Sequence, residues 1–283
     1  MSMNRNYFFV VGSFRSGTTL LAVMLDRHSR LGIPPETNFF NEVAPKLFVR
    51  SSRVLKFVLR NWTRISDLGL DPALVCERLG HTKWQSTDVL TAILDLYAEI
   101  RGKPRCGAKT PQHLSHVPRI FRRLPDTKIV CMLRDGREAA LSLASMPWWN
   151  KRGLRAAAKH WQRNVQLMEK FSRAYPGSFR VVRYEDLVNQ PREILSNIMD
   201  YLGEEFQPAQ INTDVQSNLV LPRSTEWKGK ALEVIDRGHI GSRISKARAE
   251  ELAFLTRTMR DELERYGYEI SGSRLPLRTS IPS

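Results

Sequence analysis

The sequence has little of what marks exported or membrane-bound proteins. Its 283 residues contain only three cysteines, Cys76, Cys106 and Cys131, which form no CxxC pair and no even framework. This excludes a disulfide scaffold and a structural zinc site, and it predicts buried, reduced thiols. No apolar run approaches the about 20 residues that span a bilayer, and residues 7–11 are too short for a signal-peptide core. We therefore expect no membrane anchor and a cytoplasmic location.

Clustered charge is also missing, although the chain is strongly basic. Lysine and arginine number 44 against 29 aspartate and glutamate residues, which gives a formal net charge of +15. No run of five basic residues occurs, and this argues against a basic tail. Dispersed positive charge is compatible with an anionic small substrate, a nucleic acid or an anionic membrane surface. Hydrophobic residues make up 42% of the chain, which is enough for a core and excludes global disorder.

Strand and helix signals alternate along the chain. Residues 7–11 are continuously apolar, as in a buried parallel strand, and a short strand is expected at 31–33. Other strand candidates are 105–109, 127–133 and 179–184, and helical candidates are 87–100, 136–146, 154–174, 192–202 and 246–266. The pattern predicts an α/β fold with a P-loop-like, mostly parallel central sheet flanked by helices. We expect one domain over 1–270 with a helical insertion at about 39–102, a long functional loop over 207–241, and a flexible tail at 271–283.

A glycine-containing loop, residues 12–19, follows the first strand and precedes the first helix. Glycines let the backbone approach an anion, while loop amides and the helix N-terminus supply positive charge. The GxxxxG part of the Walker A pattern is present, but Thr18 stands where that pattern has lysine. The cation is instead Arg15, inside the loop. The loop therefore predicts phosphate binding without the lysine contact that triphosphate hydrolysis needs.

A second anion anchor is predicted at the end of the strand candidate 127–133. Arg134 follows this strand directly, and Ser142 lies eight residues later, nearly two turns into the next helix. A cation at the carboxyl end of a strand, beside a helix start, is well placed for a second phosphate. The alternative is a surface ion-pair cluster of Arg134, Asp135 and Arg137.

The loop sequence Arg-Ser-Gly-Thr-Thr resembles the 5′-phosphosulfate loop of sulfotransferases that use 3′-phosphoadenosine-5′-phosphosulfate (PAPS). The tyrosylprotein and bacterial branch is most similar, and the resemblance covers residues 8–241 and the end of the last helix. It implies that PAPS is held at its phosphosulfate end by Gly12, Arg15, Ser16, Gly17, Thr18 and Thr19. The Arg134 and Ser142 spacing is similar to the family's 3′-phosphate motif. Tyr184 resembles a residue near the adenine, with core packing as the alternative.

A late segment, residues 237–243, is similar to the family's KGxxG loop. The resemblance implies that Arg237 and Gly238 close on the 3′-phosphate, and a plain glycine turn is the alternative. Other cations compete for the same contact, and the sequence does not rank them: Arg223, Lys228, Lys230 and Arg243.

Sulfuryl transfer needs a base for the acceptor hydroxyl and positive charge at the leaving phosphate. Glu36 stands in a Glu-Thr context after the first helix, similar to the catalytic base of the tyrosylprotein branch. Lys109, in a Lys-Thr-Pro segment at a strand end, resembles the family's leaving-group lysine and would act with Arg15. The alternatives are a helix N-terminal carboxylate for Glu36 and an exposed strand-end lysine for Lys109. No metal is expected.

Three further positions carry open alternatives. His113 is the substitute base, although a surface or loop histidine is the plainer interpretation. Trp148 and Trp149 line an acceptor pocket or pack as helix-end aromatics, and Ser217 is the nearest match to an assisting hydroxyl.

The sequence thus predicts a sulfotransferase that moves a sulfuryl group from PAPS to a hydroxyl or amine by in-line displacement. The acceptor is a small molecule, carbohydrate or peptide, and no nucleic-acid partner is expected. The alternatives are a basic protein that binds polyanions or nucleic acid, and a P-loop nucleotide kinase. Neither the acceptor's identity nor the oligomeric state follows from the sequence.

Overall fold

The structure, a computed structural model, describes residues 6–48, 51–80, 84–212 and 240–270. Its centre is a five-stranded sheet with the order β2-β3-β1-β4-β5, in which all neighbours are parallel. The predicted strands are all present: β1 (Phe8–Gly12), β2 (Leu31–Gly32), β3 (Arg105–Lys109), β4 (Lys128–Leu133) and β5 (Phe179–Arg183). The α/β class and the mostly parallel central sheet are confirmed.

Because all strands are parallel, their carboxyl ends lie at one edge of the sheet. Val10 lies opposite Lys109, the last residue of β3, and Gly12 lies opposite Met132 near the end of β4. The chain continues from β1 to β2 on one side of the sheet and later adds β4 on the other side. The topological switch point therefore lies between β1 and β4, where ligands bind in open α/β sheets.

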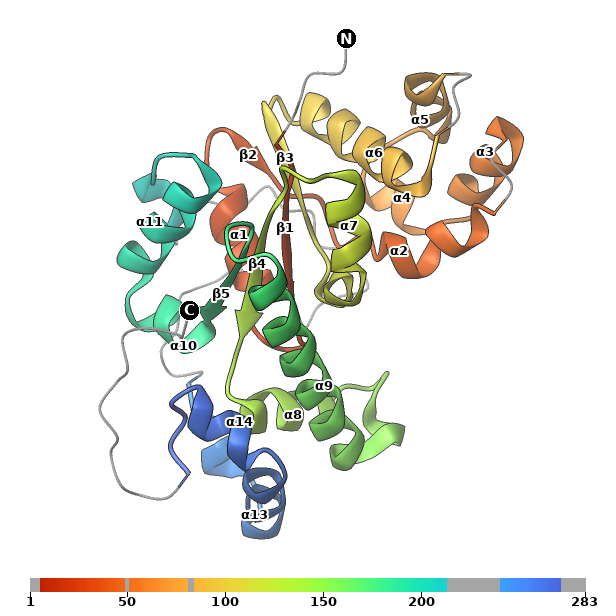
Figure 1. Ribbon diagram of the computed structural model, residues 1–283. Coiled ribbons are helices and arrows are strands. Elements are labelled where there is room, and N and C mark those ends of the chain that lie inside the picture. Colours follow the sequence, from red (N-terminus) through yellow and green to blue (C-terminus); the bar gives the residue numbers. More distant parts are fainter. Residues whose placement is uncertain (1–5, 49–50, 81–83, 213–239, 271–283) are drawn as a thin grey trace.

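Alternating side chains of β1 divide the core into two parts. Phe9 and Val11 face one side, and Phe8 and Val10 face the other. Burying each such side chain contributes about 1.5–3 kcal/mol. Figure 1 shows the helices on both faces. The first face is covered by α6 (Ser86–Ile100), α7 (Val117–Arg123), α8 (Gly136–Ala144) and α9 (Gly153–Ala174), and the second by α1 (Thr18–Asp26), α10 (Tyr184–Asn189) and α11 (Pro191–Leu202).

The predicted insertion is helical and packs onto the first face. Trp62, Leu59 and Val75 are buried in the same cluster as Phe9 of the central strand. Figure 1 shows the insertion beside α6, away from α1 and α11. Its helices before α6 are α2 (Phe39–Glu42), α3 (Ser52–Arg60), α4 (Arg64–Asp67) and α5 (Pro72–Leu79).

The C-terminal part differs from the prediction of one continuous helix. Two helices, α13 (Ala249–Thr258) and α14 (Arg260–Arg265), are separated by Met259, whose backbone is not helical. Met259 is fully buried, and its sulfur lies 2.6 Å from where a Cβ on Gly136 would stand. This close packing on the start of α8 accompanies the break between the two helices. The prediction of a single helix over 246–266 was wrong.

Two segments to which the sequence analysis gave a role cannot be compared with the structure. Most of the expected functional loop, residues 213–239, and the expected tail, 271–283, lie outside the described residues. Among the described helices, none is long and apolar enough to cross a membrane. The cysteines are free thiols; Cys106 and Cys131 are buried as predicted, whereas Cys76 is only half-buried. The one-domain organisation and the compartment stay predictions.

Candidate active site

The loop between β1 and α1 has a backbone that glycine adopts most easily. Gly12 has a φ of 152° and Gly17 a φ of 92°. A Cβ on Gly12 would lie 2.5 Å from the carbonyl oxygen of Met132, and one on Gly17 would lie 2.4 Å from the ring of Tyr184. Gly17 is the N-cap of α1 and has no side chain to occupy the first amides of the helix. Those amides are therefore available to an anion in the loop.

Two serines of the loop show how it could take a phosphate oxygen. The Ser16 hydroxyl donates to the Ser13 carbonyl at 2.7 Å, which fixes the turn. The Ser13 hydroxyl is buried, and within the described ranges it has no hydrogen-bond partner. Leaving such a group unsatisfied costs roughly 1–3 kcal/mol, which a ligand oxygen would offset. Thr18 is buried at the helix start and Thr19 is half-buried beside it.

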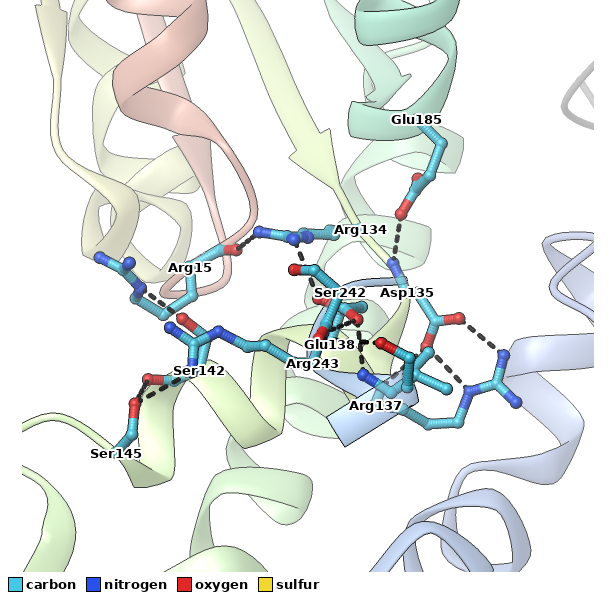
Figure 2. Close-up of polar contacts among 12 residues, drawn as sticks. Arg15, Arg134, Asp135, Arg137, Glu138, Ser142, Ser145, Glu185, Ser242 and Arg243 are labelled. Carbon is cyan, nitrogen blue, oxygen red and sulfur yellow. Dashed lines mark hydrogen bonds and ion pairs between the residues drawn. The ribbon is translucent and has the colours of Figure 1, made fainter. Parts of the chain in front are cut away.

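Arg15 connects the two predicted anion anchors. Its backbone has a φ of 65°, and its Nε donates to the Ser142 hydroxyl on α8 at 2.9 Å. Arg134 donates from Nη1 to the Arg15 carbonyl at 3.4 Å. Figure 2 shows Arg15 and Arg134 approaching each other from two different loops. The residues predicted to hold the two phosphates of a donor are thus brought together.

A third arginine reaches this place from the late part of the chain. Glu138, a buried residue of α8, accepts the backbone amides of Arg243 and Ile244, both at 2.9 Å. Its other oxygen forms an ion pair with Arg134 at 3.1 Å. Arg243 itself donates to the Ser145 hydroxyl at 3.3 Å. Sequence reasoning missed Glu138, although a carboxylate four residues after Arg134 on a helix was a usable signal.

Among the competing late cations, Arg243 is therefore the one that the described residues place at the site. The other candidates lie outside the described residues, as does the proposed assisting hydroxyl: Arg223, Lys228, Lys230, Arg237, Gly238 and Ser217.

The electrostatics of this three-arginine site favour an anion. Burial, followed by the positive charges of Arg243 and Arg134, lowers the pKa of Arg15 to about 10. Burial and the charge of Arg134 likewise lower the pKa of Arg243, while Glu138 acts in the opposite direction. The guanidinium groups of Arg15 and Arg243 nevertheless stay charged at neutral pH, and both lie near that of Arg134. Their repulsion is relieved when a multiply charged anion binds among them.

Tyr184 packs between the two anchors. The Arg134 guanidinium lies over its ring, 4.4 Å from the centroid, and the same ring faces Gly17. Tyr184 is buried, so the packing alternative describes its observed role, and its contact with an adenine stays a prediction. The alternative for the second anchor, a surface ion-pair cluster of Arg134, Asp135 and Arg137, is observed only in part. Asp135 caps α8 and pairs with Arg137 at 2.7 Å, but both are buried rather than on the surface, and Arg134 pairs elsewhere.

The proposed catalytic pair is in direct contact. Lys109 Nζ lies 2.9 Å from Glu36 Oε2, and their side chains are 2% and 18% exposed. The exposed-lysine alternative for Lys109 is therefore wrong. Glu36 lies two residues before Asn38, the N-cap of α2, and its carboxylate accepts a hydrogen bond from Lys109. Because β3 lies beside β1, this pair sits at the same sheet edge as the phosphate loop.

His113 and the two tryptophans lie around this edge. His113 is fully buried next to the rings of Phe9 and Phe40, and burial lowers its pKa to about 3. The expectation of a surface or loop histidine was wrong, because the 3-10 helix Pro111–His116 turns this side chain into the core. Trp149 is also buried, whereas Trp148 is 49% exposed. These positions do not test whether Trp148 and Trp149 line an acceptor pocket.

Phe14 joins the tryptophans to the phosphate loop. Its ring lies 5.3 Å from that of Trp148 in an edge-on arrangement and stacks on His160 at 4.9 Å. An aromatic cluster therefore borders the loop that carries Arg15. Within the described ranges, no group of three or more His, Cys, Asp or Glu side chains is placed to hold a metal ion.

Comparison with known proteins agrees with this geometry. Residues 8–208 match the model of the sulfotransferase family. The chain is 26% identical over 215 residues to the protein-tyrosine sulfotransferase of Drosophila melanogaster, covering 72% of this chain and 39% of that protein. It is 27% identical over 210 residues to protein-tyrosine sulfotransferase 2 of Gallus gallus, covering 69% and 50%. The chain thus spans about half or less of these relatives' length.

Solved structures with the same fold have lower sequence identity. The sulfotransferase domain of the Synechococcus PCC 7002 olefin synthase superimposes with a TM-score of 0.66 at 23% identity, covering 93% of this chain and 94% of that one. Mouse sulfotransferase SULT7A1 complexed with PAP gives a TM-score of 0.52 at 12% identity, covering 92% and 85%. A family model that spans residues 8–208 includes both anion anchors and the Glu36–Lys109 pair. The chain belongs to the sulfotransferase family.

Proposed function

We propose that this protein transfers a sulfuryl group from PAPS to a hydroxyl or amine of an acceptor. The observation that carries the proposal is the contact between Glu36 and Lys109 at the same sheet edge as the three-arginine site. One half of this edge suits a polyanionic donor, and the other half supplies an acid–base pair. The PAP in the mouse SULT7A1 structure adds support from a protein of the same fold.

On the donor side, the loop amides and the Ser13 and Thr18 hydroxyls would hold the 5′-phosphosulfate, together with Arg15. Arg134, Ser142 and Arg243 would hold the 3′-phosphate. Arg243 fills the position that the sequence left open between several cations, because Glu138 fixes its backbone beside Arg134. Discrimination against ATP follows from these residues. They offer charge to a 3′-phosphate, and Thr18 replaces the lysine that contacts the β- and γ-phosphates in P-loop enzymes.

In the reaction, Glu36 accepts the proton of the acceptor hydroxyl as the oxygen attacks sulfur. The bond between sulfur and the bridging phosphate oxygen breaks, and its electron pair stays on that oxygen. Arg15 and Lys109 stabilise the negative charge that develops there. Proton transfer by a positioned group contributes typically 10²–10⁴-fold to the rate. Holding attacking and leaving oxygens in line supplies further acceleration.

The acceptor is proposed only by class. Curated relatives are protein-tyrosine sulfotransferases, so a phenolic hydroxyl in a peptide is one candidate, alongside small alcohols and carbohydrates. The motifs shared with those relatives contact the donor, and a shared donor site does not determine the acceptor.

The test is an acceptor screen with PAPS in the presence of a metal chelator, using phenols, aliphatic alcohols, carbohydrates and tyrosine peptides. Release of adenosine 3′,5′-bisphosphate (PAP) that depends on both protein and acceptor is expected. Glu36→Gln should lower turnover by about 10²–10⁴-fold. Glu99→Gln, at an exposed ion pair with Arg78, is the matched control and should retain full activity. Undiminished turnover in Glu36→Gln would contradict the proposed base, and turnover of magnesium-ATP instead would contradict the reaction.

A further inference from the structure

The segment that carries Glu36 has no regular structure of its own. Glu36 lies between β2 and α2, in neither a helix nor a strand. A catalytic carboxylate must be held within about 0.5 Å of its working position, and loops hold side chains less well than helices or strands do. The contacts that fix this segment therefore matter to the reaction.

Arg64, at the start of α4 in the helical insertion, reaches this segment. Its Nη1 donates to the main-chain carbonyl of Glu36 at 2.9 Å. The rest of the guanidinium faces Glu42, with Nε donating to both carboxylate oxygens at 3.2 and 3.0 Å and Nη2 donating at 3.0 Å. Arginine's planar fork lets one side chain make both contacts with fixed geometry.

Glu42 is in turn held from two other directions. Trp62 Nε1 donates to it at 3.1 Å, and Asn38 Nδ2 donates at 2.7 Å. Burial alone would raise the pKa of Glu42, but hydrogen bonds from Arg64, Asn38 and Trp62 lower it below its ordinary value. The carboxylate stays charged, so Arg64 keeps its anchor across the neutral range.

The same network reaches the strand that carries Lys109. Asn38 has a left-handed backbone with a φ of 48°, which asparagine tolerates better than most residues. The main-chain N–H of Asn38 donates to the hydroxyl of Thr110 at 3.3 Å, and Thr110 follows Lys109 directly. The segments of both catalytic side chains are thus bound to each other and to Arg64.

A second arginine–glutamate pair in the insertion shows what is special about Arg64. Arg78 and Glu99 also form a double contact, but both are exposed and neither touches the catalytic segments. Pairs of that kind contribute about 0–1 kcal/mol to stability. Arg64 differs because it donates one N–H to the backbone of Glu36 itself.

We propose that Arg64 is a positioning residue that holds Glu36 in register with Lys109, and that Glu42 orients it for this task. The inference rests on the proposed function, because it assigns Arg64 a role only if Glu36 is the base. It gives the helical insertion a part in catalysis besides any contact with the acceptor.

The experiment compares Arg64→Met, Arg64→Lys and the matched control Arg78→Met. Turnover is followed as PAP release from PAPS, with the acceptor found in the screen or with water as acceptor. A displacement of about 1 Å can cost about 10²-fold in rate, so Arg64→Met should lower kcat by about that factor. Its affinity for PAP, measured by calorimetry, should change less than twofold. Arg64→Lys keeps the charge without the fork and should fall in between, and Arg78→Met should match the wild type.

A second readout does not depend on turnover. Hydrogen–deuterium exchange of the amides in 34–42 should become about tenfold faster in Arg64→Met, as loss of a charge-assisted hydrogen bond allows, and should not change in Arg78→Met. Equal kcat and equal exchange in the two methionine variants would overturn the inference. If Glu36→Gln is inactive while Arg64→Met is fully active, only the positioning role fails. If Glu36→Gln is fully active, the proposed function itself fails.

Discussion

The donor half and the acceptor half of the candidate site are built in different ways. The donor half comes mostly from the segments that follow β1 and β4, and Arg243 is its contribution from the late part of the chain. The acceptor half depends on the helical insertion, where Arg64 and Glu42 fix Glu36 from 28 and 6 positions away in the chain. Binding a phosphate needs backbone conformations that local sequence dictates. Holding a base on a loop needs contacts between distant side chains.

Among the further substitutions that compare the two halves, Lys109→Met is expected to have the largest effect. Removing the ammonium group takes away the charge proposed for the leaving oxygen, so turnover should fall by about 10²–10³-fold with PAP affinity much less affected. Lys103→Met is the matched control, because Lys103 precedes the same strand and binds main-chain carbonyls at its other end. Combining Glu36→Gln with Lys109→Met should cost little more than either change alone, since the pair acts as a unit. Steady-state kinetics of both single variants and the double variant measure this. If the double variant lost the product of the two single losses in turnover, Glu36 and Lys109 would not act as a unit.

The next effect concerns the donor half alone. Gly17→Ala should weaken PAP binding at least tenfold, because its Cβ would collide with Tyr184 in addition to the strain of a positive φ. Gly153→Ala offers the control, since Gly153 has a φ of 73° and nothing within 4 Å of an added Cβ. That control should lose only about 1–2 kcal/mol of stability. Calorimetry with PAP and thermal unfolding of both variants separate the effect of the collision with Tyr184 from that of the positive φ. Equal PAP affinity in the two variants would contradict the close contact between Gly17 and Tyr184.

A pH effect on stability is expected from the acceptor half and the adjoining aromatic cluster. Burial lowers the pKa of His113 to about 3 and that of His160 to about 4. The unfolded chain, with histidine pKa values near 6.5, therefore binds more protons than the folded protein between about pH 3 and 6.5. Stability is fully present above that window and falls as the pH decreases through it. For His113 alone the loss is at most roughly 5 kcal/mol, reached as the pH falls to about 3.

Urea unfolding at several pH values measures this slope. His113→Leu should flatten it, and His116→Gln, at a half-buried histidine of the same 3-10 helix, should flatten it less. An unchanged slope in His113→Leu would mean that this histidine is not the source of the acid sensitivity.

The smallest effect on the fold is expected at Trp148. Its ring is half exposed and contacts Phe14 beside the phosphate loop. Trp148→Ala should change stability by about 1 kcal/mol or less and leave PAP affinity unchanged. A raised KM for an acceptor would extend the acceptor half to the turn that follows α8, and an unchanged KM would limit it to the insertion side.

The sequence predicted the strands and the position of the loop between β1 and α1 because both are local properties. Apolar runs dictate buried parallel strands, and the glycines with Arg15 dictate the loop. Resemblance to the family predicted Glu36 and Lys109 as residues of one site, and the structure adds that their side chains are in contact. The sequence did not predict the break at Met259. The break accompanies the close packing of Met259 on Gly136, and no residue in 246–266 indicates it. His113 was misassigned because its burial depends on Phe40 from the insertion. The Arg64–Glu42 network was missed for the same reason, since ion pairs between distant residues leave no periodic pattern.

The central claim is that the three-arginine site binds a PAPS-type donor, with Arg134 and Arg243 at its 3′-phosphate, and calorimetric titration tests it most directly. PAP is titrated into the wild type, Arg134→Ala and the control Arg180→Ala, and magnesium-ATP is titrated into the wild type. Arg180 is exposed and binds the Asn197 carbonyl away from the site. The account predicts metal-independent PAP binding that is tighter than magnesium-ATP binding and about ten- to a hundredfold weaker in Arg134→Ala only. A preference for magnesium-ATP, or equal PAP affinity in Arg134→Ala and the wild type, would contradict it.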